Sequence, residues 1–119
     1  SHLPDEAFVM LSIPLFDWVL ENLIKNALDA TEGAGKITIE ASVHNKQVYI
    51  LISDTGKGMD SQTANQVFEP GFTTKKRGWG LGLPLSKRIM ESYHHGKLFV
   101  KNTAPGKGTT FCLLLPVAN

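Results

Sequence analysis

Three polar side chains recur at regular intervals in one segment of the chain. Asn22, Asn26 and Asp29 are separated by four and then three residues, which places them on one face of an α-helix. Asparagine has a low helix propensity, so two of them inside a helix cost stability. Their amide oxygens, together with phosphate oxygens and water, would suit a hard cation such as Mg²⁺. The stripe predicts either a metal-binding face or a solvated face, and taken alone it favours the solvated face.

A short segment with an aspartate and two glycines, Asp-Thr-Gly-Lys-Gly-Met at 54–59, follows an apolar stretch. The Asp54 carboxylate can accept a hydrogen bond from an exocyclic amine such as the N6 group of adenine. Gly56 and Gly58 would let the backbone approach a planar ring, because glycine has no Cβ. Aspartate and glycine are also common in ordinary turns after strands. The segment is therefore equally compatible with a base-binding loop and with a plain turn.

Glycines are concentrated in Gly-Trp-Gly-Leu-Gly-Leu at 78–83, directly after Lys75, Lys76 and Arg77. They lead into a predicted helix, and free backbone N–H groups at a helix N-terminus can bind an anion. The pattern differs from the dinucleotide-binding fingerprint of a βαβ unit. It also lacks the Gly-Lys-Ser/Thr of a Walker A loop. We expect either an anion-binding lid or a flexible loop with a solvated basic run.

The last glycine-containing segment, Gly-Lys-Gly-Thr-Thr-Phe at 106–111, enters the final predicted strand. As a structural element it is a hairpin turn. If the strands of Thr109 and Asp54 are neighbours, the Thr109 hydroxyl could donate a hydrogen bond into the same polar site as Asp54.

Helices must position these segments, and hydrophobic periodicity predicts three of them. The first begins at Pro14 and Leu15 and stops near Gly33. The second is short, is capped by Asp60 or Ser61 and ends at about Phe68. The third covers about 81–94. Its apolar stripe is expected at Leu81, Leu85, Ile89 and Tyr93, and that of the first helix at Phe16, Val19, Leu20, Leu23, Ile24, Ala27 and Leu28.

Alternating apolar and polar residues predict two hairpins. One pairs strands at 36–43 and 47–53 around the turn His44-Asn45-Lys46, and the other pairs 97–102 with 109–115. A further short strand is expected at 6–13. Hairpins interspersed with helices predict an α+β fold: a two-layer α/β sandwich, with a mostly antiparallel mixed sheet and about three helices on one face.

Composition limits the class of protein. The chain has 119 residues, 42% hydrophobic residues and a net charge of +1, as expected for one soluble domain over 1–119 without a nucleic-acid or membrane-binding surface. No signal peptide is visible in these residues, and no apolar run approaches about 20 residues. Its one cysteine, Cys112, excludes a disulfide framework and is expected to be a buried structural thiol. We expect a cytoplasmic domain, in which residues 1–4 are a cloning remnant or linker.

Taken together and in order, the motifs resemble those of sensor histidine kinases. Residues 22–27 look like the N box, 54–58 the first glycine box, 68–75 the F box, 78–83 the second glycine box and 106–111 the final glycine box. The resemblance covers nearly the whole chain. It implies the Bergerat-type ATP-binding fold that this family shares with DNA gyrase B, Hsp90 and MutL.

The resemblance implies Mg²⁺–ATP as ligand, with Asn26 on the metal and Asn22 near the phosphates or metal. It implies that Asp54 binds adenine N6, directly and through water, with support from Thr109. Residues 69–80 would form the lid, and backbone amides of 80–83 would contact the phosphates. The implied ATP-binding set is Asn22, Lys25, Asn26, Asp54, Gly56, Gly58, Met59, Phe68, Thr74, Lys75, Gly78, Gly80, Leu81, Gly82, Leu83 and Thr109.

Two positions depart from the family pattern. Many members carry Lys or Arg where Asp29 stands. Lys75 or Arg77 of the lid, or less favourably Lys25, would replace that cation, and Asp29 is interpreted as a helix-face residue. Trp79 stands where a small or hydroxylic residue is usual. Lid packing is the preferred interpretation of Trp79, with stacking on the nucleotide or on a partner domain as the alternative.

The position of a general base separates kinases from hydrolases within this fold. ATPases of the fold usually carry a Glu four residues before the metal-binding Asn, where this chain has Asn22. Glu21 lies about 140° around the helix from Asn26 and should point elsewhere. The sequence therefore favours a histidine kinase fragment whose phosphoacceptor histidine, dimerisation domain and response regulator are separate. The domain would be cytoplasmic even in a membrane-anchored sensor. The alternatives are an ATPase or anti-sigma serine kinase of the same fold, and a signalling module that no longer binds nucleotide.

Overall fold

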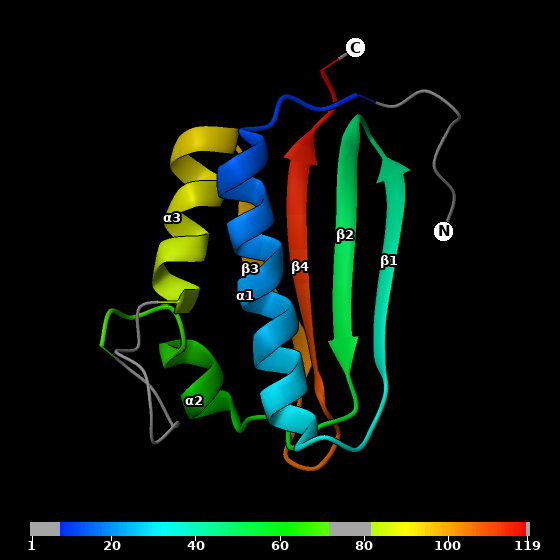
Figure 1. Cartoon of the computed structure of the whole chain (residues 1–119), viewed down its shortest axis with the longest axis vertical. Helices are drawn as coiled ribbons and strands as arrows, with labels where there is room; N and C mark the ends of the chain where they lie inside the picture. The colour runs from blue at the N-terminus through cyan, green and yellow to red at the C-terminus, as the bar shows by residue number, and fades with distance from the viewer. Residues whose placement is uncertain (1–7, 72–81, 119) are drawn as a thin grey trace.

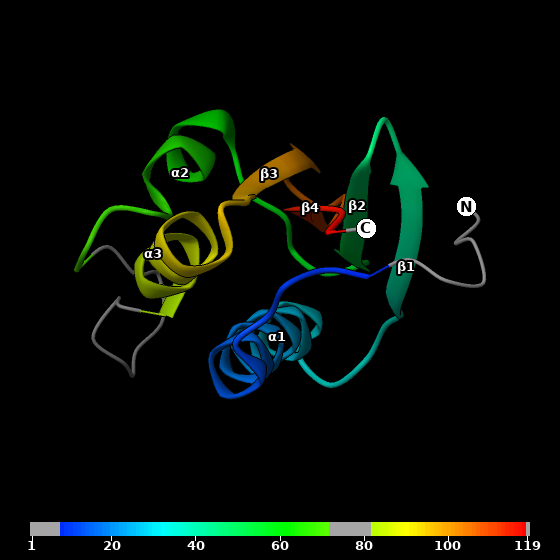
Figure 2. The same ribbon diagram turned by 90° about the horizontal axis from the view of Figure 1, so that it is seen from above.

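Four antiparallel strands form one sheet, and helices pack against one of its faces (Figure 1). The computed structural model describes residues 8–71 and 82–118. The strand order is β1-β2-β4-β3. Figure 2 shows α1 and α3 side by side on the covered face, with α2 beyond α3 near β3. The bounds are α1 Ile13–Thr31, β1 Ile37–His44, β2 Gln47–Asp54, α2 Ser61–Gln66, α3 Gly82–His94, β3 Lys97–Thr103 and β4 Thr109–Pro116.

The first helix, α1, is held to the sheet by an apolar face with helical spacing. Its buried residues are Phe16, Val19, Leu23 and Ala27, as the periodicity predicts. Leu28, expected on the same face, is instead 54% exposed. The helix ends when Glu32 adopts a left-handed conformation and donates its N–H to the Asp29 carbonyl. The helix therefore carries the asparagine stripe along the edge of the core.

Both predicted hairpins are confirmed, and they meet through β2 and β4, the two inner strands of the sheet. Asn45 and Lys46 turn the first hairpin with φ values of 51° and 62°, as the tightest hairpin turns require. β4 pairs with β2 on one side and with β3 on the other. Apolar residues of β4 are buried on both faces, and Cys112 among them is 1% exposed. Burial raises the pKa of the Cys112 thiol, an effect that the charge of Lys101 partly opposes.

The short helix α2 begins as predicted. The Asp60 side chain caps it by accepting a hydrogen bond of 2.7 Å from the Thr63 amide. This bond, together with the Thr63 hydroxyl, lowers the pKa of the Asp60 carboxyl. The cap fixes the point at which the chain leaves residues 54–59, called the glycine loop below, and enters α2.

The strand predicted at 6–13 is wrong over its described part. Residues 8–12 have no regular secondary structure, and Ile13 already belongs to α1. The segment meets the other end of the chain through a hydrogen bond from the Ala118 amide to the Phe8 carbonyl. No ladder is formed there, because Pro14 starts the helix within the first turn.

The apolar stripe predicted for α3 is confirmed only at Ile89, which is 4% exposed. Leu85 and Tyr93 are 43% and 63% exposed, and Leu81 lies outside the described residues. The buried residues are Ser86, Ile89, Met90 and His94. Ser86 and His94 can be buried on this face because each has a hydrogen-bond partner. Ser86 bonds the Asn22 side chain, and His94 bonds the backbone at Ser12 and Ile89.

His94 connects the end of α3 to the start of α1. Its Nε2 accepts a 3.0 Å hydrogen bond from the Ser12 amide, and its Nδ1 lies 3.1 Å from the Ile89 carbonyl. Because an amide only donates and a carbonyl only accepts, the ring is neutral with its proton on Nδ1. The Phe16 ring packs edge-on against the His94 ring, with 5.8 Å between the centroids.

Among the described residues, no helix is long and apolar enough to cross a membrane.

Candidate nucleotide-binding site

Asp54 and Thr109 lie side by side at the end of the sheet. Asp54 ends β2, Thr109 begins β4, and the two are directly opposite in the register, so their side chains share one face. That face also carries Ile52 and Phe111 of the core, and the two polar residues are only 9% and 6% exposed. The Gly56 amide donates a 2.8 Å hydrogen bond to Asp54 Oδ1. The strands of Asp54 and Thr109 are therefore neighbours, as a shared polar site requires.

The glycine loop after Asp54 is pressed between α1 and the last hairpin. A Cβ on Gly56 would collide with the Ala30 carbonyl of α1, and the Lys57 amide donates to that same carbonyl at 3.1 Å. Gly58 has a φ of +66°, and a Cβ there would collide with the Ala104 carbonyl. These glycines are thus required by the packing of the loop on its own chain, before any ligand is considered.

Thr103, which the sequence analysis did not single out, joins the loop to the last hairpin. Its hydroxyl accepts a 2.9 Å hydrogen bond from the Met59 amide. It also lies 2.8 Å from the Thr109 hydroxyl and 3.1 Å from the Gly108 carbonyl. A threonine at the end of β3, facing a threonine at the start of β4, could have been noted once the hairpin was predicted.

The asparagine face of α1 lies close to the glycine loop, because Asn26 is one helical turn before Ala30, whose carbonyl contacts that loop. Asn26 is half-buried and lies four residues before Ala30, about 6 Å along the helix axis. Asn22 is also half-buried; its Nδ2 donates to Ser86 Oγ of α3 at 3.1 Å, and its amide packs against the Gly82 backbone. The stripe therefore runs from the glycine loop to the start of α3, which makes it more than a solvated face.

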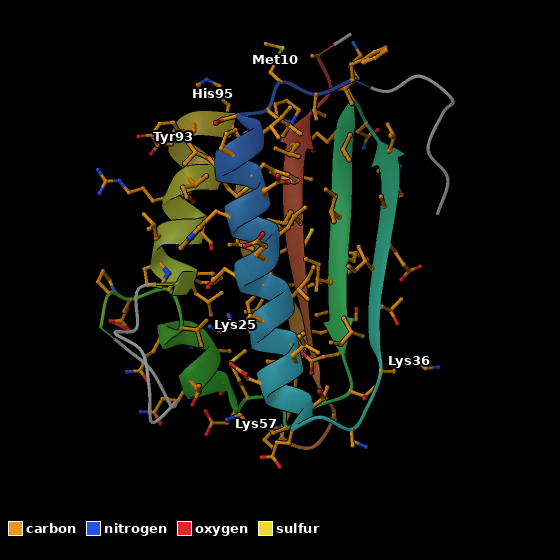
Figure 3. The ribbon with its side chains drawn as sticks, viewed as in Figure 1. Met10, Lys25, Lys36, Lys57, Tyr93 and His95 are labelled. Atoms are coloured by element: carbon orange, nitrogen blue, oxygen red, sulfur yellow. The ribbon has the colours of Figure 1, made fainter. Side chains whose placement is uncertain are left out.

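The remaining predicted residues on α1 differ in exposure from the two asparagines. Asp29 and Lys25 are exposed, and Lys25 is labelled in Figure 3. Glu21 is exposed as well. On α1, therefore, the two asparagines are half-buried, whereas the charged residues beside them are exposed to solvent.

Three predicted residues border the hydrophobic core. Met59, Phe68 and Leu83 are half-buried and pack against it. The Phe68 ring lies edge-on to Phe111 at 6.3 Å, and the Lys87 ammonium lies 5.1 Å from the Phe68 centroid. These contacts give Phe68 a packing role and bring a cation close to it. The predicted residues Thr74, Lys75, Gly78, Gly80 and Leu81, together with Arg77 and Trp79, lie outside the described residues.

The donor set near Asn26 fits magnesium bound through phosphate better than a metal bound by protein alone. Over 8–71 and 82–118, no three His, Cys, Asp or Glu side chains are grouped to hold a metal ion. Mg²⁺ usually keeps several waters and takes one or two protein oxygens in addition to substrate phosphates. A half-buried carboxamide such as that of Asn26 meets this requirement.

The sequence and the fold match a known family. The sequence profile of the histidine kinase-, DNA gyrase B-, and HSP90-like ATPases matches residues 13–119, from the start of α1 onward. The chain belongs to this family. The α+β fold predicted from the sequence is thereby confirmed, and the family is one of ATP-binding domains.

Similar full-length proteins are histidine kinases. The signal transduction histidine-protein kinase AtoS of Escherichia coli K12 is 42% identical over 104 residues, which cover 87% of this chain and 17% of AtoS. Sporulation kinase C of Bacillus subtilis 168 is 36% identical over 99 residues, covering 83% of this chain and 23% of that kinase. The chain therefore spans less than a quarter of the length of these relatives.

Solved structures agree. The nucleotide-free catalytic domain of histidine kinase ThkA superposes with a TM-score of 0.79 at 33% identity, covering 91% of this chain and 70% of that one. Full-length ShkA in complex with AMPPNP superposes with a TM-score of 0.83 at 27% identity, covering 96% of this chain and 24% of ShkA. This fold therefore occurs both as an isolated catalytic domain and within a full-length kinase.

Proposed function

We propose that this chain binds Mg²⁺–ATP and donates the γ-phosphate to a histidine on a separate dimerisation domain, as one step of two-component signalling. One observation carries the proposal. Asp54 and Thr109 are buried side by side, next to the last turns of the helix that presents Asn26. A base-recognising group and a metal-binding amide are thus held by one rigid set of elements.

The adenine would be bound at the Asp54 end. The Gly56 amide holds Asp54 Oδ1, and this bond orients the carboxylate. An ionised carboxylate only accepts hydrogen bonds and has about four lone-pair sites, so it keeps acceptor capacity for the adenine amine. The close packing of Gly56 and Gly58 on the chain supports a loop whose backbone is already in place before the base arrives.

The phosphates would lie along Asn26 and Asn22 toward the start of α3. Mg²⁺, when bound, would neutralise phosphate charge and orient the oxygens, with Asn26 as its protein ligand. The hydrogen bond from Asn22 to Ser86 ties α1 to the first turns of α3. This bond supports a fixed spacing between the metal-binding amide and the helix N-terminus at which the lid amides would meet the phosphates.

Transfer to an external histidine is favoured over hydrolysis because, among the described residues of α1, the position usual for a general base carries no carboxylate. Glu21 is exposed, whereas the position usual for a base is occupied by Asn22, which bonds Ser86. His94 is also unsuited to accept phosphate, because both of its ring nitrogens are hydrogen-bonded and it is 3% exposed. We infer that the acceptor histidine and its dimerisation domain lie outside residues 1–119, that a response regulator receives the phosphoryl group, and that the domain works in the cytoplasm.

Calorimetric titration with Mg²⁺–AMPPNP tests the nucleotide site. Asp54→Asn keeps an acceptor for the Gly56 amide but replaces acceptor capacity toward the base with an NH₂ donor. It should weaken binding by about 10- to 100-fold, the value of a hydrogen bond to a charged group. Asn26→Asp should change the Mg²⁺ dependence of binding. Asp17→Asn, an exposed change on α1, is the matched control and should bind as the wild type does. Unchanged affinity in both site variants would refute the proposal.

A second assay separates transfer from hydrolysis. Incubated with γ-labelled ATP, the chain alone should hydrolyse slowly, and label should appear on a dimerisation domain added in trans. Glu21→Gln should leave both rates unchanged. Fast hydrolysis that is abolished by Glu21→Gln would instead identify an ATPase.

A further inference from the structure

Three hydroxyl- or carboxyl-bearing residues form a row across the end of the sheet. Asp54 of β2 lies opposite Thr109 of β4, and Thr109 lies opposite Thr103 of β3. Residues paired directly across antiparallel strands place their side chains on the same face. Thr103 therefore stands behind Thr109, on the side away from Asp54. It is half-buried, and the residues it contacts are Met59, Gly108 and Thr109.

The contacts of Thr103 determine which way its proton and that of Thr109 point. The Met59 amide can only donate, so Thr103 accepts from it at 2.9 Å. The Gly108 carbonyl can only accept, so Thr103 must give its single proton to it at 3.1 Å. The remaining contact, 2.8 Å between the two threonine hydroxyls, can then be a hydrogen bond only if Thr109 is the donor.

The opposite assignment leaves a poorer network. If Thr103 donated to Thr109, no proton would remain between the Thr103 oxygen and the Gly108 carbonyl oxygen. Gly108 is buried, and a buried carbonyl that loses a partner is unfavourable. In the favoured assignment, the three protons of the Met59 amide, the Thr103 hydroxyl and the Thr109 hydroxyl satisfy three contacts, and Thr103 uses both of its lone pairs.

We propose that Thr103 is a specificity-determining positioning residue, which holds the Thr109 proton away from the nucleobase so that Thr109 and Asp54 present acceptors only. The inference rests on the proposed function and reverses one sequence-based expectation, since Thr109 accepts from the base or its water instead of donating to it. Toward the C6 substituent of a purine, an edge of acceptors matches an amine, which donates. It opposes a 6-oxo purine, whose carbonyl would face lone pairs.

The test compares the affinities of ADP and IDP, whose bases differ at C6 (amine against carbonyl) and at N1 (lone pair against N–H). The change in the ADP-to-IDP ratio between the wild type and the Thr103 variant therefore carries the test. Mg²⁺–ADP and Mg²⁺–IDP are titrated calorimetrically into the wild type and into Thr103→Val, which keeps the side-chain shape and removes the hydroxyl. The wild type should prefer ADP by about tenfold or more. In Thr103→Val the Thr109 proton becomes free to donate to the carbonyl, so the ratio of the two dissociation constants should fall by at least about fivefold.

Two further variants distinguish specificity from structure. Thr103→Ser restores the hydroxyl and should keep the wild-type ratio. Thr110→Val removes a comparable hydroxyl, which bonds Ser53 at 2.9 Å on the opposite face of β4, and should also keep it. If Thr103→Val does not melt cooperatively, Thr103→Ala provides the same comparison with a smaller side chain.

The outcomes separate this inference from the proposed function. If the wild type binds neither nucleotide, both fail. If it prefers ADP and loses affinity in Asp54→Asn, yet Thr103→Val weakens ADP and IDP equally, the nucleotide site stands. Thr103 then has only a structural role, and the specificity inference is overturned.

Discussion

Truncation of His94 is predicted to destabilise the domain without affecting nucleotide binding. His94→Ala removes the acceptor of the Ser12 amide, the donor to the Ile89 carbonyl and the edge-on contact with Phe16. Each hydrogen bond contributes about 1 kcal/mol, and the aromatic contact contributes about 1 kcal/mol. The free energy of unfolding should therefore fall by about 3 kcal/mol in total.

The corresponding change in melting temperature follows from the size of the chain. For 119 residues, the entropy of unfolding near the midpoint is about 0.25 kcal/mol/K, so 3 kcal/mol corresponds to about 12 °C. Thermal unfolding followed by circular dichroism measures the shift. His95→Asn is the matched control, since His95 is exposed and has a left-handed φ of 53°, which asparagine tolerates. It should melt within about 2 °C of the wild type.

Nucleotide binding should be preserved because His94, at the end of α3, packs beside the first turn of α1, far from Asn26. Its ring contacts Phe16, and Asn26 lies ten residues further along α1, about 15 Å away along the axis. Figure 3 shows His95 and Lys57 at opposite ends of the molecule. Well below its melting temperature, His94→Ala should bind Mg²⁺–AMPPNP within about twofold of the wild type. A melting temperature equal to that of His95→Asn, or loss of binding by the folded variant, would refute this reasoning.

Three further predictions concern the glycine loop, the thiol and the short helix. Gly56→Ala should lower the melting temperature and weaken nucleotide binding by about tenfold or more, because the new Cβ would collide with the Ala30 carbonyl. The control Gly33→Asn, at a left-handed position with open space around it, should change neither property. Cys112 should react with a thiol reagent only after unfolding, and since its pKa is raised, the stability it contributes should be lost as pH rises above about 8.5. Asp60→Ala should lower the melting temperature at neutral pH. Because the pKa of Asp60 lies below its usual value of 3.8, the stability from the ionised cap should be lost as pH falls through that lowered pKa, and the difference from the wild type should then disappear.

The chemical types at the site were largely predictable from sequence, and the partners of those residues were not. The order of the motifs, through their resemblance to those of histidine kinases, predicted ATP as the ligand. Thr103 was missed, because its importance depends on facing Thr109 across a hairpin while receiving the Met59 amide from a distant loop. The contact of Asn22 with Ser86 likewise joins residues 64 positions apart. Contacts of this kind leave no periodic signal in one sequence.

Most helices and strands were predictable from the sequence alone, because their causes are local. Helical spacing from Phe16 to Ala27 specified α1, and alternation with a short polar turn specified the β1–β2 hairpin. Tertiary structure decided which face of α3 is buried, since Ser86 and His94 point inward only when Asn22 and Ser12 are there to bond them. It likewise decided that residues 8–12 form no strand and that Asp54, Thr109 and Thr103 share one row. Burial of a polar side chain depends on a partner brought close by the fold, and hydrophobicity along the chain does not reveal that partner.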